Sequence, residues 1–105
     1  MYDVIIIGAG PGGIFSAYEL TKHNENLKIA IFEEGHSLEK RHCPIDGKKI
    51  TSCIHCKSCS IMSGFGGAGA FSDGKYNITN DFGGTLYEYI GKEKAIKLMH
   101  YVDDI

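Results

Sequence analysis

The first part of the chain contains two short apolar runs separated by a periodic stretch. Residues 4–7 form an uninterrupted β-branched run, and a second apolar run covers residues 27–32. Runs of this length are typical of strands that are covered on both faces in a parallel sheet. From Gly13 the spacing of apolar residues changes to three and four, which predicts a helix ending in the polar residues 23–26. The expected helical face comprises Ile14, Ala17, Tyr18 and Thr21.

A strand, a glycine turn, a helix and a second strand make a βαβ unit with parallel strands and a right-handed crossover. The pattern downstream of this unit is different. A short helix is expected at 85–90 and an amphipathic helix at 93–104, with Ala95, Leu98, Met99 and Val102 on one face. We therefore expect an α/β fold over residues 1–105. Its segments are a Rossmann-like βαβ unit (1–35), a Cys-rich loop (36–62), a Gly-rich loop (63–84) and a helical region (85–105).

Composition narrows the class of protein. The chain has 105 residues, of which 43% are hydrophobic and 23% charged, with a formal net charge of −2. These values are ordinary for a single globular domain, and the charge gives no reason to expect a nucleic-acid partner. No apolar run is long enough for a signal peptide or a membrane span, so we expect a cytoplasmic location. In that compartment, cysteines are more often free, metal-bound or redox-active than held in structural disulfides.

The glycines after the first run match the pattern G-x-G-x-x-G at Gly8, Gly10 and Gly13. The first glycine permits a tight turn, the second lets a pyrophosphate approach the backbone, and the third lets the helix pack on the strand. N–H groups in the first helical turn then face the phosphates. Pro11 and Gly12, which lie inside the motif, complete the predicted phosphate-binding turn.

An acidic residue stands where this motif requires one. Glu33 lies 20 residues beyond Gly13, at the end of the second predicted strand. A carboxylate there accepts hydrogen bonds from a ribose 2′-hydroxyl and repels a 2′-phosphate, which disfavours NADP. The neighbouring Glu34 is a second candidate, although we expect it to point into solvent and contribute less. The motif by itself does not separate NAD from FAD.

The segment 36–60 contains every cysteine of the chain and three of its five histidines. The cysteine spacing is C-x9-C-x2-C-x2-C, which suits thiolate ligation of zinc or of an iron–sulfur cluster. Two other interpretations remain: a redox dithiol, favoured by the neighbouring cations, or thiols without a shared function. The four candidate metal ligands are Cys43, Cys53, Cys56 and Cys59, with His42 and His55 as possible substitutes.

Two groups of motifs carry a resemblance to flavoproteins. "YDVIIIGAGPGG" and "IAIFEEG" resemble the N-terminal segment of two-dinucleotide-binding-domain flavoproteins, which bind the ADP half of FAD there. "GFGGAGAFSDGKYNITN", preceded by "RHCP" and "CIHCKSC", resembles a family of bacterial and archaeal FAD-dependent dehydrogenases, mostly of unassigned substrate. The resemblance covers nearly all of residues 1–80. It implies that the chain is the FAD-binding N-terminal part of a longer oxidoreductase.

The second glycine cluster, residues 63–75, gains a function from this resemblance. Such a loop can run close to the cofactor and offer backbone N–H groups to it, whereas the alternative is a mobile surface loop. The candidate cofactor contacts in this loop are Gly66, Gly67 and Ser72.

Other functional classes stay open at this stage. One is an NAD-binding module with a zinc-stabilised loop, and another is a thiol or iron–sulfur electron carrier fed by flavin. The C-x4-C pair of the glutathione reductase type of flavin enzyme is absent from the sequence. No acid–base pair or nucleophile can be assigned, so we expect no catalysis by this fragment alone. The expected partners are FAD and a small-molecule substrate or an electron-transfer partner.

Overall fold

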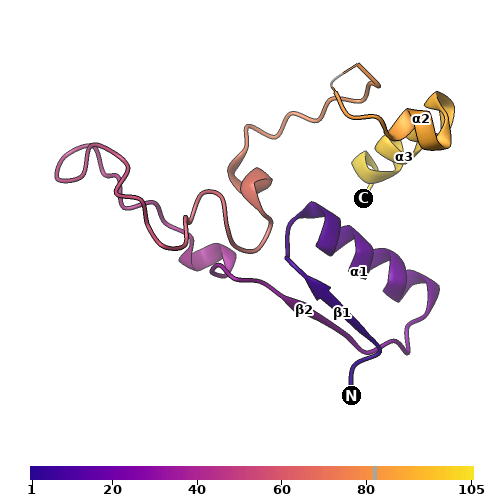
Figure 1. Ribbon diagram of the computed structural model, residues 1–105, viewed down its shortest axis with the longest axis horizontal. Coiled ribbons are helices and arrows are strands. Elements are labelled where there is room, and N and C mark those ends of the chain that lie inside the picture. The colour runs from indigo at the N-terminus through magenta and orange to yellow at the C-terminus, as the bar shows by residue number, and fades with distance from the viewer. Residues whose placement is uncertain (82) are drawn as a thin grey trace. The chain divides into compact units, whose positions relative to one another are not determined.

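The computed structural model describes residues 1–81 and 83–105. Residue 82, which belongs to the predicted loop 63–84, lies outside the described residues. The chain divides into two compact units, Met1–Ser72 and Asp73–Ile105, and each is considered separately below. Figure 1 labels the elements of both units.

The first unit begins with the predicted parallel α/β arrangement. Strand β1 (Val4–Ile7) pairs in parallel with β2 (Ile29–Phe32), with Val4 opposite Ile29 and Ile7 opposite Phe32. Helix α1 (Pro11–His23) connects them. The helix begins before the predicted Gly13, because the fixed φ of proline suits the first position of a helix. The structure thus confirms a Rossmann-like unit with two parallel strands.

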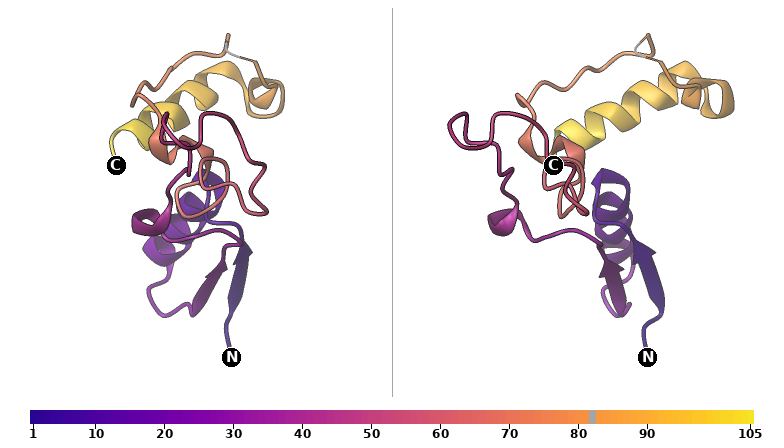
Figure 2. Two further views of the ribbon diagram at one scale, coloured as in Figure 1. Left: turned by 90° about the vertical axis from the view of Figure 1, so that its left-hand side faces the viewer. Right: turned by 60° about the vertical axis from the view of Figure 1, so that its left-hand side comes forward.

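Helix α1 covers one face of this sheet (Figure 2). Ile6 faces the helix, since a Cβ placed on Gly13 would lie 3.2 Å from its Cγ2 atom. Ile5 and Ile7 point to the opposite face of the sheet, and their side chains are 59% and 82% exposed. Phe32, which pairs with Ile7, is 55% exposed. The expectation of strands covered on both faces is therefore wrong for the described residues. The apolar runs arise from two apolar faces, of which this unit covers one.

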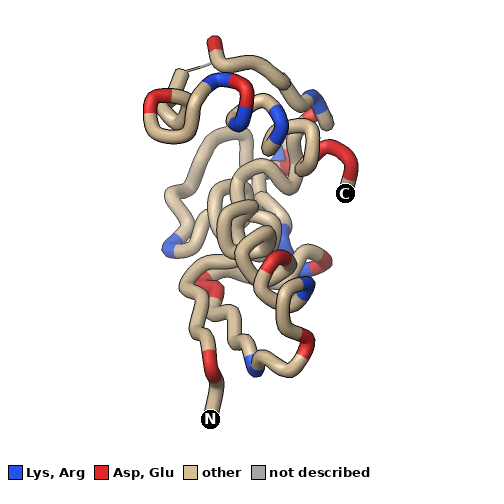
Figure 3. The backbone as a smooth tube through the Cα atoms, turned by 90° about the vertical axis from the view of Figure 1, so that its right-hand side faces the viewer, with Lys and Arg blue, Asp and Glu red and all other residues tan. Residues whose placement is uncertain are grey.

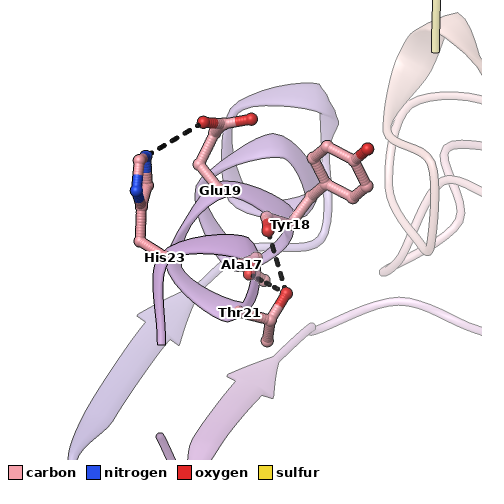
Figure 4. Close-up of polar contacts among 5 residues, drawn as sticks. All are labelled: Ala17, Tyr18, Glu19, Thr21 and His23. Carbon is pink, nitrogen blue, oxygen red and sulfur yellow. Dashed lines mark hydrogen bonds and ion pairs between the residues drawn. The ribbon is translucent and has the colours of Figure 1, made fainter. Parts of the chain in front are cut away.

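The outer side of α1 also differs from the predicted pattern. Tyr18 is 40% exposed and Thr21 is exposed, so neither belongs to the packed face. Figure 4 shows that the Thr21 hydroxyl donates to the carbonyl oxygens of Ala17 and Tyr18, at 3.0 and 2.9 Å. On the same helix, the Nε2 atom of His23 lies 3.6 Å from the Oε2 atom of Glu19. A threonine that bonds to its own helix needs no partner elsewhere, which explains its exposed position.

The remainder of the first unit is irregular. After β2 it contains two short 3-10 helices, η1 (Leu38–Lys40) and η2 (Ala68–Phe71). Residues 41–67 between them form neither helix nor strand. The order of this segment depends on side-chain and backbone hydrogen bonds, which also build the candidate site.

The described residues of the second unit include helices α2 (Leu86–Ile90) and α3 (Lys92–Asp103), close to the predicted ranges. They are joined at Gly91, whose φ of +83° permits the sharp change of direction. Ala95 of α3 is fully buried, whereas Leu98 on the predicted apolar face is 43% exposed. Acidic and basic positions are interspersed along the chain (Figure 3). Over the described residues, the structure holds no helix of the length and apolarity that crossing a membrane requires.

Candidate dinucleotide-binding site

The turn between β1 and α1 depends on glycine at two positions. Gly8 has a φ of +97°, which side chains disfavour, and its N–H donates to the carbonyl oxygen of Phe32 at 2.7 Å. A Cβ on Gly13 would overlap the carbonyl oxygen of Gly8, so only glycine lets the helix approach the strand this closely. The N-cap residue is Gly10, and no side chain caps the helix. The first-turn N–H groups of α1 therefore remain available to an anion.

The outer side of this turn is open. A Cβ placed on Gly8 or Gly12 would meet nothing within 4 Å. For Gly10 the nearest atom is the Cα of Gly67, at 3.9 Å. The turn thus has room for a ligand on one side and contacts the Gly-rich loop on the other.

Glu33 connects three segments of the unit. Its Oε2 atom accepts a hydrogen bond from the N–H of Ala9 at 2.7 Å, and its Oε1 atom accepts bonds from Gly35 and Gly64 at 3.0 and 2.9 Å. The pKa of Glu33 lies below its ordinary value, mainly because of the Ala9 and Gly35 N–H groups, with smaller contributions from Gly64 and the charge of Arg41. The carboxylate is therefore held in its ionised form.

The bonding capacity of this carboxylate is not exhausted. Two ionised oxygens offer about four acceptor positions, and Oε2 receives one of the three backbone bonds. A ribose hydroxyl can therefore donate to Glu33 without displacing a backbone partner. Glu34 is exposed, and its Oε1 atom accepts a bond from the Ser63 hydroxyl at 3.0 Å.

The Gly-rich loop is ordered by Arg41, the sole arginine of the chain, which is only 3% exposed. Its guanidinium carbon lies 4.9 Å from the centre of the Phe71 ring. Its N–H groups donate to four backbone carbonyls within 2.7–2.8 Å, those of Ser60, Ile61, Phe65 and Gly67. A planar fork of five donors suits this task, whereas a lysine ammonium does not.

These segments enclose a pocket of about 380 Å³ at the carboxyl ends of both strands. Such a volume falls in the range of small-molecule sites. The lining residues are Ile7, Gly8, Gly10, Phe32, Glu33, Glu34, Met62, Ser63, Gly64 and Gly67.

The structure brings only some of the predicted residues to this pocket. Those that line it are Gly8, Gly10, Glu33, Glu34 and Gly67; those that do not are Pro11, Gly12, Gly13, Gly66 and Ser72. Gly66 instead joins the Gly-rich loop to the turn, because its N–H donates to the Ala9 carbonyl oxygen at 2.8 Å. Ser72 is exposed at the end of η2.

Sequence reasoning missed the apolar wall of Ile7, Phe32 and Met62, and it missed Gly64 and Arg41. Ile7 and Phe32 were assigned to strands, and nothing in their pattern marks the last residue of each as part of a site. Arg41 stands out in the sequence only as the single arginine among 11 basic residues, and its backbone acceptors carry no mark in the sequence.

The cysteines lie around a second pocket, of about 260 Å³. All four are free thiols; three are exposed and Cys59 is partly buried. The pocket is lined by Cys43, Pro44, Ile45, Cys53, Ile54, His55, Cys56, Cys59 and Ser60. The substitute ligand His42 is not part of this lining.

The predicted metal site is not supported. Within the part of the chain that the structure describes, no three His, Cys, Asp or Glu side chains are grouped so as to hold a metal ion. Spacing sets how far apart the thiols lie along the chain but not the directions of their side chains, and residues 41–67 have no regular helix or strand geometry to set those directions. The C-x2-C spacing alone therefore does not bring the sulfurs to a common centre, and we withdraw zinc and an iron–sulfur cluster as cofactors.

Comparisons with known proteins concern the N-terminal part above all. Residues 1–40 match the model of the Thi4 family. Thiamine thiazole synthase 4, chloroplastic, of Physcomitrium patens is 53% identical over 32 residues, which is 30% of this chain and 9% of that protein. An uncharacterized protein of Clostridium beijerinckii is 35% identical over 71 residues, which is 68% of this chain and 13% of that protein. No solved structure shows a significant match.

The chain therefore spans a small part of the length of these relatives. The matched residues 1–40 contain β1, the glycine turn, α1, β2 and Glu33. The family match and the geometry thus concern the same segment. Together they support an FAD-binding, flavoprotein-like N-terminal segment.

Proposed function

We propose that this chain binds the ADP portion of FAD in the pocket at the ends of β1 and β2. The observation that carries the proposal is the meeting of three features in one pocket. These are the open glycine turn, the ionised Glu33 carboxylate and the Gly-rich loop. We propose further that the whole protein is a flavin-dependent dehydrogenase whose substrate is unassigned.

Each part of an ADP group has a counterpart in the pocket or beside it, at the start of α1. The N–H groups of α1 and the backbone at Gly8 and Gly10 suit a pyrophosphate. The remaining acceptor position of Glu33 suits a ribose hydroxyl. Ile7 and Phe32, whose side chains are exposed, offer an apolar surface to the adenine ring. When bound, FAD supplies hydride and electron transfer, and the protein contributes binding and orientation.

A single methyl group tests this proposal. In Gly10→Ala the backbone needs no change, because φ is −78° and ψ −177°, and the nearest atom to the new Cβ lies at an ordinary 3.9 Å. The methyl group occupies the place where a pyrophosphate would approach. We expect the affinity for FAD and ADP, measured by isothermal titration calorimetry, to fall at least about tenfold, a loss of about 1.4 kcal/mol. The far-ultraviolet circular dichroism should not change.

Gly69→Ala is the matched control. Gly69 lies outside the pocket, and a Cβ there meets nothing within 4 Å. Its ligand affinity should equal that of the wild type. Unchanged FAD affinity in Gly10→Ala would refute the proposed pyrophosphate position. Titrations with NAD and NADP identify the dinucleotide: binding of NAD without FAD would replace FAD by NAD as the ligand, and NADP should bind weakest.

A further inference from the structure

The cysteine pocket is separate from the dinucleotide pocket, because the two share no lining residue. All four thiols of the chain line it, and none is in a disulfide. The described residues offer no metal-binding group there. Apart from metal binding, the reaction that several thiols around one cavity can carry out together is thiol–disulfide exchange.

Cys59 differs from the other three cysteines in how it is held. Its carbonyl oxygen accepts hydrogen bonds from the N–H groups of Met62 and Ser63, at 3.0 and 2.8 Å. The next two residues, Ser60 and Ile61, are fixed by the buried Arg41. Cys59 is therefore the anchored member of the group, whereas the other three thiols are exposed.

The same surroundings favour a thiolate at this position. The backbone N–H groups of Met62 and Ile61 lower the pKa of the Cys59 thiol, the charge of Arg41 adds to this effect, and burial opposes it. A thiolate is the attacking form in thiol–disulfide exchange.

Cys53 and Cys56 are the two cysteines nearest to Cys59 in the sequence. The sulfur of Cys53 already accepts a hydrogen bond from the N–H of His55, at 3.4 Å. Cys56 has an exposed thiol in the same pocket and stands at C-x2-C spacing from Cys59. Cys43 lies across a longer stretch of irregular chain.

We propose that Cys59 and Cys56 form a redox pair that exchanges with low-molecular-weight disulfides. The Cys59 thiolate attacks one sulfur of the small disulfide, forms a mixed disulfide and releases one small thiol, which takes a proton. The Cys56 thiolate then attacks the Cys59 sulfur and releases the second small thiol. The protein dithiol is oxidised by two electrons, and the small disulfide is reduced by two.

The test uses the full chain, oxidised glutathione as the probe and EDTA in the buffer. Lys57 lies between the two cysteines, so trypsin separates peptide 50–57 from peptide 58–75. In the wild type and in the matched control Cys53→Ser, non-reducing mass spectrometry should find these peptides joined by a disulfide. In Cys56→Ser the joined peptides should disappear, and peptide 58–75 should carry one glutathione.

Several outcomes would overturn the pair. One is a joined product that survives Cys56→Ser but is lost in Cys53→Ser, and another is the absence of joined peptides in the wild type. A second measurement needs no variant: the iodoacetamide reaction rate of each cysteine against pH in the native protein. Cys59 should become reactive at a lower pH in the native protein than in the protein unfolded in urea, and a native midpoint at or above the unfolded one would also refute the proposal.

Discussion

At the scale of single residues, one carboxylate organises the candidate site. Glu33 accepts N–H bonds from Ala9 in the turn after β1, from Gly35 two residues along the chain, and from Gly64 in the Gly-rich loop. The acid that the motif assigns to ribose recognition therefore also assembles the walls of the pocket. The proposed contact with ribose and the hydrogen bonds to the pocket walls both require the ionised form of Glu33.

Acid should weaken the fold through this residue. Because the folded-state pKa of Glu33 lies below its ordinary value, its stabilisation is fully present above the ordinary glutamate pKa, about 4.3. It is lost as the pH falls from there through the lower folded-state pKa. In Glu33→Gln this part of the pH dependence should vanish. Urea unfolding midpoints measured at several pH values check the prediction.

Asp46→Asn is the control for this experiment. The pKa of Asp46 is also lowered, by the N–H groups of Ile50, Lys48 and Lys49 in its own turn, so its removal should change the acid dependence as well. It lies outside the dinucleotide pocket, however, and ADP affinity should fall in Glu33→Gln alone. Equal ADP affinities in both variants would argue against a contact between Glu33 and ribose.

Neighbouring glycines of the turn should respond oppositely to the same change. Gly12→Ala places a methyl group in open space within a helix, where alanine is favoured over glycine by up to about 1 kcal/mol. Gly13→Ala places it on the carbonyl oxygen of Gly8 and should destabilise the protein. Thermal unfolding of the two variants gives the comparison. A Gly13→Ala variant as stable as Gly12→Ala would contradict the close packing of α1 on the turn.

At the scale of elements, the irregular loops are held by one buried side chain. Arg41 satisfies four carbonyls of residues 60–67 and packs on Phe71. Neither η1 nor η2 contributes a buried residue of its own. The Gly-rich wall of the pocket is thus held by hydrogen bonds in place of an apolar core, and Arg41 supplies more of them than any other side chain.

Replacing this arginine by lysine should loosen the wall. Arg41→Lys retains the charge, but an ammonium with three donors cannot serve four carbonyls in a fixed plane. We expect a loss of about 2–3 kcal/mol in the free energy of unfolding, and faster amide hydrogen exchange at Gly64 and Gly67. Lys40→Met, at an exposed neighbour, should change stability by less than about 0.5 kcal/mol. Wild-type exchange rates in Arg41→Lys would show that other contacts hold the loop.

At the scale of the whole molecule, the apolar surface is only partly covered. Ile5, Ile7 and Phe32 form an exposed apolar face of the sheet opposite α1. Exposed patches of this kind usually mark contact surfaces. The chain spans 13% and 9% of the lengths of the two relatives that it matches. In a protein of that length, other residues are available to cover this face of the sheet.

The sequence predicted the parts of the fold that depend on local order. The alternation of apolar runs and helical periodicity predicted β1, α1 and β2, and the glycine spacing predicted the turn. The far wall of the pocket could not be predicted in the same way. Glu33 meets Gly64, and Arg41 meets Gly67, through bonds to backbone atoms that every residue type carries. Likewise, the C-x2-C spacing placed the thiols near one another but did not determine the positions of their sulfurs.

The close approach of Gly67 to Gly10 has a consequence for the order of events during synthesis. The pocket draws on residues 7 through 67, while β1, α1 and β2 are complete at Phe32. A nascent chain that has emerged from the ribosome only as far as β2 can pair its strands, but it lacks Met62 and the glycines that close the pocket. At about 5–20 residues per second, the missing stretch takes seconds to emerge. The closed pocket therefore forms only after the βαβ segment has emerged, whereas the residues proposed to contact ADP, from Ile7 to Glu33, emerge with that segment.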